Sequence, residues 1–335
     1  MRIGIDARAL QTGMRYQGMG IYTYNLIRQL VDEMKVSHTF VILGYRDLPQ
    51  GVGTRVGKRL NVWRPYRRYE GGKKQAITEA QETVFMPIDC KRGALDLYHN
   101  PVQLGTAAWY PCPSVVTIHD VIPLLYPKEY LGGGMWMRTV YRFAARATRI
   151  ITVSENSKRD IVEKLRVPPE KVTVTYEGVD RRFRPEHPEK DVLMFRRSLG
   201  LPADRRYLLF TAGMTAPDPR KNVKEFLSVF ARLAKESGME DLDLVIAGKE
   251  GPATPPIREE ARRLGIEDRV IFVGFVELEH LPILYALASA YIFPSRYEGF
   301  GLPVLEAMAS GCPVISSNAA SLPEVVGDGG VAGPS

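Results

Sequence analysis

Two glutamates, Glu298 and Glu306, lie eight residues apart in the stretch SRYEGFGLPVLEAMASG, residues 295–311. Carboxylates accept hydrogen bonds, so the pair suits a ligand that carries several hydroxyl groups. The stretch follows the strand-like run AYIFPS and leads into a helix predicted over residues 303–310. Pro303 suits the first position of that helix, because no amide hydrogen is needed there.

The start of this helix is also suited to an anion. The amide groups around Phe300, Gly301 and Leu302 have no partner inside the helix, and the helix dipole favours negative charge there. Gly299 and Gly301 let a ligand approach the backbone closely. The segment therefore predicts a site for phosphate and hydroxyl groups together, which a nucleotide sugar carries. A capped helix with an acidic residue near its start would explain Glu306 alone, but neither the glycines nor Glu298.

The elements that must position these groups alternate between strands and helices. Strand-like runs cover 2–7, 40–45, 95–100, 114–120, 149–154 and 171–178, then 207–213, 242–248, 269–275, 290–295 and 313–317. Helical periodicity covers 20–34, 135–147 and 155–165, then 221–236, 256–264, 278–287 and 303–310. This alternation predicts an α/β protein with two doubly wound parallel-sheet domains. Ligands of such sheets bind beyond the carboxyl ends of the strands, so we expect the site in the crevice between the domains.

The domain boundaries follow from composition. The charged segment 177–190 contains two prolines and separates the two halves, which predicts domains over 1–180 and 191–335 joined by a linker over 181–190. The chain has 335 residues, of which 45% are hydrophobic and 25% charged. These values exclude a disordered or collagen-like chain. Three cysteines without metal-type spacing argue against a disulfide framework or a zinc site and favour a reducing compartment.

The chain lacks an apolar run long enough to span a membrane, and its amino terminus lacks a signal-peptide pattern, so we expect a cytoplasmic protein. The net charge of +7 is concentrated in residues 55–74, which hold eight basic residues and one acidic residue. Such a segment fits a membrane surface or an anionic substrate, and it equally fits a solvated loop. We expect no nucleic acid partner, because no recognition motif accompanies it.

The first motif resembles the E-x7-E signature of retaining glycosyltransferases of family 4, which have the GT-B fold of two Rossmann-like domains. Further stretches follow in the order of that family: YQGMGIYTYNL (16–26), TIHDVIP (117–123), TVSENSKRDI (152–161), EGVD followed by F-RP (177–185), PRKN (219–222), VIAGKEG (245–251) and FVGFV (272–276). The resemblance covers nearly the whole chain. Relatives usually continue past its last residues, so we expect the second domain to lack the usual C-terminal helices.

The resemblance implies a role for each matching residue of the second half. Glu306 would receive the ribose hydroxyls of the donor, and Glu298 would contact the transferred sugar. Lys221, with Arg220 beside it, would neutralise the diphosphate leaving group. Many relatives carry an arginine where this chain has Met214. The second positive charge then comes from Arg220, or else phosphate binding rests on Lys221 and backbone donors.

In the first half the resemblance places His119 beside the transferred sugar, as a hydrogen-bonding group close to the reaction centre. Asp120 either orients the imidazole or caps the next turn. Gly18 and Gly20 would bring backbone donors to the diphosphate.

Main-chain groups at strand ends tend to bind the base in this family. The matching positions are Gly248, Lys249, Gly274 and Val276.

These expectations describe a retaining glycosyltransferase that moves a sugar from a GDP- or UDP-sugar donor to a hydroxyl of a glycan or lipid-linked acceptor. By resemblance to bacterial enzymes of surface polysaccharide synthesis, GDP-mannose is the leading donor. We expect neither metal nor another cofactor, and peripheral contact at the inner membrane face through residues 55–74. A non-catalytic nucleotide-sugar-binding protein and an epimerase remain alternatives. A glycoside hydrolase is rejected, because its chemistry would leave Lys221 and the glycines unused.

Overall fold

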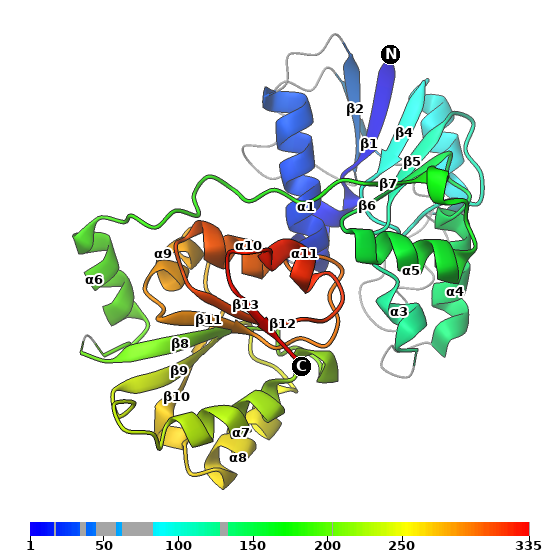
Figure 1. Cartoon of the computed structure of the whole chain (residues 1–335). Coiled ribbons are helices and arrows are strands. Elements are labelled where there is room, and N and C mark those ends of the chain that lie inside the picture. The colour runs from blue at the N-terminus through cyan, green and yellow to red at the C-terminus, as the bar shows by residue number, and fades with distance from the viewer. Residues whose placement is uncertain are drawn as a thin grey trace. The chain divides into compact units, whose positions relative to one another are not determined.

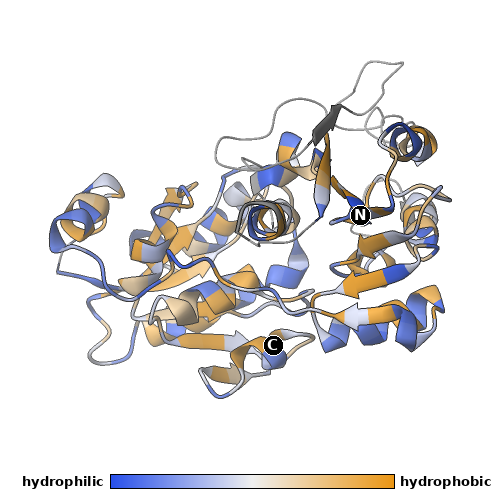
Figure 2. Cartoon of the chain, turned by 90° about the horizontal axis from the view of Figure 1, so that it is seen from above, coloured by the Kyte–Doolittle hydropathy of each residue, from blue (hydrophilic) through white to orange (hydrophobic). Residues whose placement is uncertain are grey.

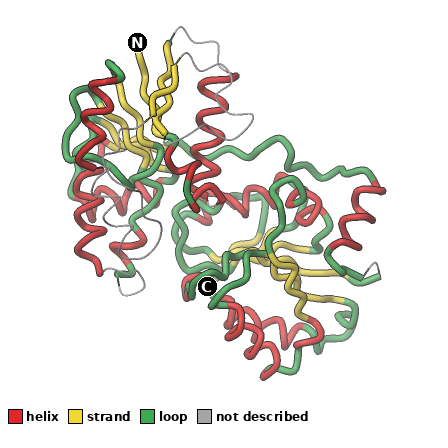
Figure 3. The backbone as a smooth tube through the Cα atoms, turned by 180° about the vertical axis from the view of Figure 1, so that it is seen from behind, coloured by secondary structure: helices red, strands yellow, loops and turns green. Residues whose placement is uncertain are grey.

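The computed structural model describes residues 1–16, 18–33, 38–44, 58–61, 83–127, 133–202 and 204–334. The chain divides into two compact units, Met1–Glu177 and Gly178–Ser335. Each unit holds a parallel sheet with helices on both faces, as the strand–helix alternation predicts (Figures 1 and 3). Most of the segment 55–74 lies outside the described residues, so the structure gives no account of the expected membrane contact.

The sheet of the first unit has the order β3-β2-β1-β4-β5-β6-β7, and every described pair of neighbours is parallel. Its first six positions follow the doubly wound order 3-2-1-4-5-6. In this order β2 and β3 are added on one side of β1, and the strands from β4 onward are added on the other side. The strands are β1 (Arg2–Asp6), β2 (Thr39–Gly44), β3 (Lys58–Asn61), β4 (Leu97–Asn100), β5 (Ser114–Thr117), β6 (Arg149–Thr152) and β7 (Val172–Val174).

The helices of the first unit are α1 (Gly18–Ile27), continued by a π-helical segment (Arg28–Glu33), then a helix over residues 83–92, α3 (Ile122–Leu125), α4 (Gly133–Ala144) and α5 (Glu155–Leu165). Ser154 begins α5 as its N-cap, since its hydroxyl accepts a hydrogen bond from the Ser157 amide at 3.0 Å. The sequence predicts both this cap and the bounds of α5 correctly.

The sheet of the second unit repeats the order as β10-β9-β8-β11-β12-β13, again parallel throughout the described pairs. The strands are β8 (Arg206–Thr211), β9 (Leu242–Ala247), β10 (Val270–Gly274), β11 (Ala290–Phe293), β12 (Val314–Ser317) and β13 (Val331–Gly333). The helices are α6 (Glu189–Ser198), α7 (Val223–Leu233), α8 (Thr254–Arg263), α9 (Leu281–Ala286), α10 (Leu302–Ala309) and α11 (Leu322–Val326).

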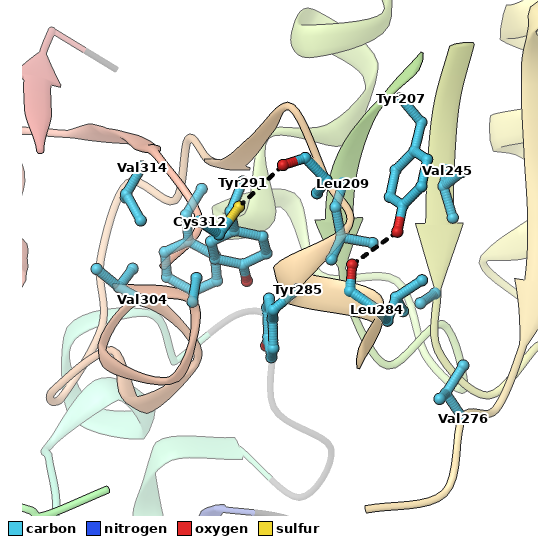
Figure 4. Packing of buried hydrophobic residues seen from close by; sticks show 14 of the residues in the cluster. Tyr207, Leu209, Val245, Val276, Leu284, Tyr285, Tyr291, Val304, Cys312 and Val314 are labelled. Carbon is cyan, nitrogen blue, oxygen red and sulfur yellow. Dashed lines mark hydrogen bonds between the residues drawn. The ribbon is translucent and has the colours of Figure 1, made fainter. Parts of the chain in front are cut away.

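Apolar residues of this second sheet pack in two layers, one on each face. One layer packs against α7 and α8, and the other against α9, α10 and α11. The strands are correspondingly hydrophobic along their length, whereas the helices alternate between polar and apolar residues (Figure 2). In the second layer, the Tyr207 hydroxyl donates to the Leu284 carbonyl at 2.7 Å, which ties β8 to α9 (Figure 4).

The segment predicted as a linker is partly incorporated into the second unit. Residues 178–188 contain no helix or strand, but Phe183 is buried in the core of that unit and α6 begins at Glu189. Among the described residues, no helix is long and apolar enough to cross a membrane.

Candidate functional site

The candidate site of the second unit lies where its strand order reverses. β8 and β11 are neighbours there, and the loops that follow them contribute Lys221 and Glu298. The Lys221 Nζ atom lies 2.7 Å from Oε1 of Glu298. Both side chains are largely but not completely buried, with exposed fractions of 23% and 14%. The predicted cation and the first predicted glutamate therefore meet at the position where doubly wound sheets bind their ligands.

Arg220 plays a different part from Lys221. Its guanidinium bonds to Asp218 at 2.7 Å and to the Tyr297 carbonyl at 3.2 Å, and its own carbonyl accepts from the Arg296 amide at 2.7 Å. These contacts join the loop after β8 to the loop after β11. Arg220 is thus committed to holding the two loops together, and Lys221 is the more accessible of the two cations.

Aromatic residues of β11 lie beneath this ion pair. The Lys221 Nζ atom is 5.2 Å from the centre of the Phe293 ring, which stacks with the Tyr291 ring at 5.8 Å. Burial raises the pKa of Tyr291, and the charges of Glu306 and Glu298 raise it further. The two predicted glutamates therefore lie near the same phenol group.

Glu306 lies on α10 and is 6% exposed. The hydroxyl of Tyr285, on α9, donates to its Oε2 atom at 3.3 Å. Burial raises the pKa of Tyr285 well above its usual value, so this hydroxyl remains a hydrogen-bond donor at neutral pH. Sequence reasoning missed Tyr285, because a tyrosine within an apolar helix reads as an ordinary core residue.

The start of α10 is held in a defined conformation. The helix begins at Leu302, so Pro303 occupies its second position rather than the predicted first. Gly301 has φ 109°, and a Cβ atom there would lie 2.7 Å from the Leu322 side chain. The position therefore requires glycine for conformation and space.

A second side chain that the sequence analysis missed supports this loop. The Ser321 hydroxyl is fully buried and lies 2.9 Å from the Glu298 carbonyl and 2.7 Å from the Phe300 carbonyl. It holds the loop that carries Glu298 against the start of α11. No motif in the sequence distinguishes Ser321 from an ordinary helix-capping serine.

The positions predicted for base recognition lie at neighbouring strand ends. The Gly248 amide donates to the Gly274 carbonyl at 2.8 Å, and the Lys249 carbonyl accepts from the Met214 amide at 3.1 Å. The Val276 side chain is part of the hydrophobic core. These residues are close in the fold, because they lie at or just beyond the ends of the neighbouring strands β9 and β10.

Met214 is a core residue in this protein. It is 2% exposed and packs among the residues between the sheet and α7 and α8. The Thr254 hydroxyl lies 3.8 Å from its Sδ atom. The side chain at this position therefore contributes packing to the core of the second unit.

In the first unit, His119 follows β5 and is 6% exposed. Its Nε2 atom lies 3.0 Å from the Pro101 carbonyl oxygen and its Nδ1 atom 3.4 Å from Oε1 of Glu177. The Tyr22 ring of α1 meets the imidazole edge-on, with ring centres 4.8 Å apart. Elements after β4 and β7 and the helix after β1 thus converge on this histidine.

Asp120 caps the turn that follows, which was one of the two open alternatives. Its Oδ1 atom accepts a hydrogen bond from the Ile122 amide at 2.8 Å, at the start of α3. The ring nitrogens of His119 instead face Pro101 and Glu177.

The two glycines of the predicted glycine loop differ in the space around their Cα atoms. A Cβ atom on Gly20 would lie 2.2 Å from the Met14 carbonyl oxygen, so this glycine is required by the packing of α1 on the preceding turn. Around Gly18, the first residue of α1, the described residues leave space for a side chain. Across the described part of the chain, no three His, Cys, Asp or Glu side chains are grouped as metal ligands would be.

Comparison with known proteins assigns the family. Residues 16–183 match the family model Glycosyltransferase Family 4, and residues 194–333 match the model for glycosyl transferases group 1. The chain therefore belongs to glycosyltransferase family 4, which confirms the resemblance drawn from the motifs.

Two relatives with curated descriptions are mannosyltransferases. The O-antigen chain mannosyltransferase B of Escherichia coli is 33% identical over 222 residues, a match that covers 65% of this chain and 56% of that protein. The MMP alpha-(1->4)-mannosyltransferase of Mycolicibacterium hassiacum is 28% identical over 352 residues, covering 93% of this chain and 80% of that protein. The chain thus spans little more than half the length of the first relative.

Solved structures confirm the GT-B fold. Sucrose-phosphate synthase from Thermosynechococcus elongatus superposes with a TM-score of 0.73 at 19% identity, covering 96% of this chain and 82% of that one. WaaG, a glycosyltransferase of lipopolysaccharide biosynthesis, superposes with a TM-score of 0.68 at 16% identity, covering 97% and 83%.

Proposed function

We propose that the protein is a retaining glycosyltransferase that moves mannose from GDP-mannose to an acceptor hydroxyl during synthesis of a polysaccharide or glycolipid. The contact between Lys221 and Glu298 carries this proposal, because it joins a cation and a hydroxyl acceptor at the strand reversal of the second unit.

Each of the site residues of the second unit has a role in this reaction. Lys221 stabilises the negative charge that grows on the diphosphate as the bond to the sugar breaks, and such stabilisation lowers the barrier. Glu298 holds Lys221 in position beforehand and accepts hydroxyl groups of the transferred sugar once the phosphates bind the ammonium. Glu306, oriented by Tyr285, accepts the ribose hydroxyls. The amides at the start of α10 bind the phosphates.

The proton of the attacking acceptor hydroxyl passes to the leaving phosphate on the same face of the sugar. This route retains the anomeric configuration and requires no protein nucleophile. It also requires no metal, because Lys221 supplies the positive charge that a metal would otherwise bring.

The mannose donor rests on the relatives, of which two from different bacteria are mannosyltransferases. The O-antigen relative supports a glycan or lipid-linked acceptor. Residues 55–74 would place the enzyme against an anionic membrane surface, where a lipid-linked acceptor is found.

Calorimetric titration with GDP, UDP, ADP and GDP-mannose tests the donor site. We expect Glu306→Gln to weaken binding of the preferred nucleotide roughly 10- to 100-fold, the range for one hydrogen bond to a charged group. Lys221→Met should lower kcat roughly 100-fold or more, as removal of one group that stabilises developing charge does. Lys224→Met, an exposed lysine of α7, is the matched control and should change neither value. If none of these nucleotides binds, the proposal is wrong.

Product analysis separates the alternatives. Transfer with retention gives an α-linked mannoside and free GDP, which proton NMR of the anomeric position identifies. An epimerase changes the sugar without releasing nucleotide, and a non-catalytic protein binds the donor without consuming it. Either of the last two results would replace the proposed activity.

A further inference from the structure

The exposed side of α4 in the first unit carries a row of arginines. Arg138 and Arg142 lie one turn apart on the helix, and Arg146 follows in the turn that ends it; all three are exposed. Met135 extends the row toward the helix start and is 81% exposed. The opposite side of α4 packs into the core, with Tyr141 fully buried. These four exposed residues, Met135, Arg138, Arg142 and Arg146, are here called the α4 stripe.

Carboxylates do not neutralise this row. Residues 133–149 hold four arginines and no acidic residue. None of these arginines forms an ion pair with any other described residue. Arg146 instead lies over the Phe143 ring, 5.8 Å from its centre, and Arg149 donates to the Thr148 carbonyl at 3.2 Å. Like charges four residues apart destabilise a helix, so the row has a cost that an anionic partner would remove.

Positive charge continues beyond the end of α4. Arg149 begins β6 and Lys171 directly precedes β7, and the two strands pair with Ile150 opposite Val172. The Lys171 Nζ atom donates to the Ala145 carbonyl at the end of α4, at 2.7 Å. Burial lowers the pKa of Lys171, and the charge of Arg149 lowers it further. Because Lys171 already serves the helix end, the helix dipole does not explain the arginines around it.

The mixture of side chains in the α4 stripe indicates the kind of partner. A guanidinium group binds phosphate oxygens through two parallel hydrogen bonds. A soluble polyanion would account for the arginines alone. The boundary between lipid headgroups and acyl chains also accepts an exposed apolar side chain such as Met135, with the half-buried Trp136 beside it.

We propose that the α4 stripe is a docking surface for a bilayer that contains anionic phospholipids. This inference rests on the proposed function, in which the acceptor is lipid-linked, and adds a surface separate from residues 55–74. Arg149 and Lys171 lie at the amino ends of β6 and β7, whereas His119 follows the carboxyl end of the parallel strand β5. The cations at the end of α4 and the candidate site residue therefore lie at opposite edges of this sheet.

Co-sedimentation of the full chain with vesicles tests the surface. We expect binding to vesicles of equal parts phosphatidylglycerol and phosphatidylcholine, weakening as salt is added, and none to phosphatidylcholine alone. Arg142→Gln/Arg146→Gln should weaken binding roughly 25-fold, or about 5-fold for each charge removed near an anionic surface. Arg232→Gln/Lys235→Gln removes the same charge from exposed side chains at the end of α7 and should leave binding unchanged.

Met135→Ser separates a bilayer from other polyanions, because it leaves the charge intact. This variant should bind the anionic vesicles roughly 3- to 10-fold more weakly, the loss for one partly buried methionine, and bind the soluble polyanion heparin as the wild type does. Unchanged melting temperatures would show that the variants fold.

The outcomes separate this inference from the proposed function. Vesicle binding that is unchanged in Arg142→Gln/Arg146→Gln or in Met135→Ser would overturn the docking surface, whatever the enzyme transfers. Vesicle binding that depends on the α4 stripe, in a protein without transferase activity, would uphold the surface and refute the proposed reaction. Transfer to a soluble acceptor by a protein that binds no vesicles would do the reverse.

Discussion

Replacement of Gly248 by alanine should destabilise the second unit far more than the same replacement at Gly274. Both glycines have positive φ, 153° and 70°, and both were predicted to serve base recognition. Their surroundings differ. A Cβ atom on Gly248 would lie 1.7 Å from the Ala212 carbonyl oxygen, whereas no described atom lies within 4 Å of one on Gly274.

The magnitudes follow from this geometry. To reach about 3.3 Å, the shorter end of ordinary carbon–oxygen contacts, the two backbones must separate by about 1.6 Å. That shift disrupts the hydrogen bonds from Gly248 to Gly274 and from Ala212 to Ala247, which measure 2.8 and 3.0 Å. With about 1–3 kcal/mol of backbone strain and about 1 kcal/mol or more per hydrogen bond, the loss is about 3–6 kcal/mol. Gly274→Ala should cost only about 1–2 kcal/mol of strain.

Urea unfolding followed by circular dichroism measures the two free energies of unfolding. All three tryptophans belong to the first unit, so their fluorescence follows that unit separately and serves as an internal control. Equal losses in the free energy of unfolding for the two variants would show that the packing against Ala212 does not determine the need for glycine at position 248.

Three further results are expected. Asp243→Ala should lower the free energy of unfolding by about 3–5 kcal/mol in urea denaturation, because it leaves two arginines without their buried carboxylate. The matched variant Asp241→Ala, which removes an exposed ion pair with Arg206, should lower it far less. Burial lowers the pKa of His99 to about 4. The unfolded chain therefore takes up the proton at a higher pH than the folded chain, so the free energy of unfolding should fall by about 3 kcal/mol between about pH 6.5 and pH 4. His99→Gln should remove this loss from the pH profile of urea midpoints. A hydrogen bond between Cys90 and Cys112 lowers the pKa of Cys112 and raises the pKa of Cys90. Mass spectrometry after iodoacetamide treatment should therefore find Cys112 modified first. Preferential labelling of Cys90 would contradict the assignment.

The regular elements with a strong apolar pattern were predictable from the sequence. All eleven strand-like runs form strands, and the bounds of α5 agree residue by residue. Three of the elements that the sequence did not predict have a weak apolar pattern, namely β3, β13 and α6. The strand β3 reads KRLN and β13 spans three residues, and both lie at sheet edges, where backbone pairing suffices without an apolar stripe. α6 was missed because Phe195 is its one buried residue.

Several predicted strands end earlier than expected because their last residues belong to site loops. The run over 114–120 forms a strand only over 114–117, and His119 lies beyond it. The run over 290–295 ends as a strand at Phe293, before the loop that leads to Glu298. Periodicity cannot separate a strand from the extended backbone that continues it, since both alternate side chains in the same way.

The sequence by itself determined the family, the α/β class and the side chains suited to a nucleotide sugar, because these depend on residue types and their order. Only the tertiary structure decided which of them meet. Lys221 and Glu298 are 77 residues apart and come into contact because the strand order places β8 beside β11. Glu177 reaches His119 for a similar reason, since the loops after parallel strands gather at one edge of the sheet. Such contacts depend on strand order and side-chain direction in space, which no local pattern of residues records.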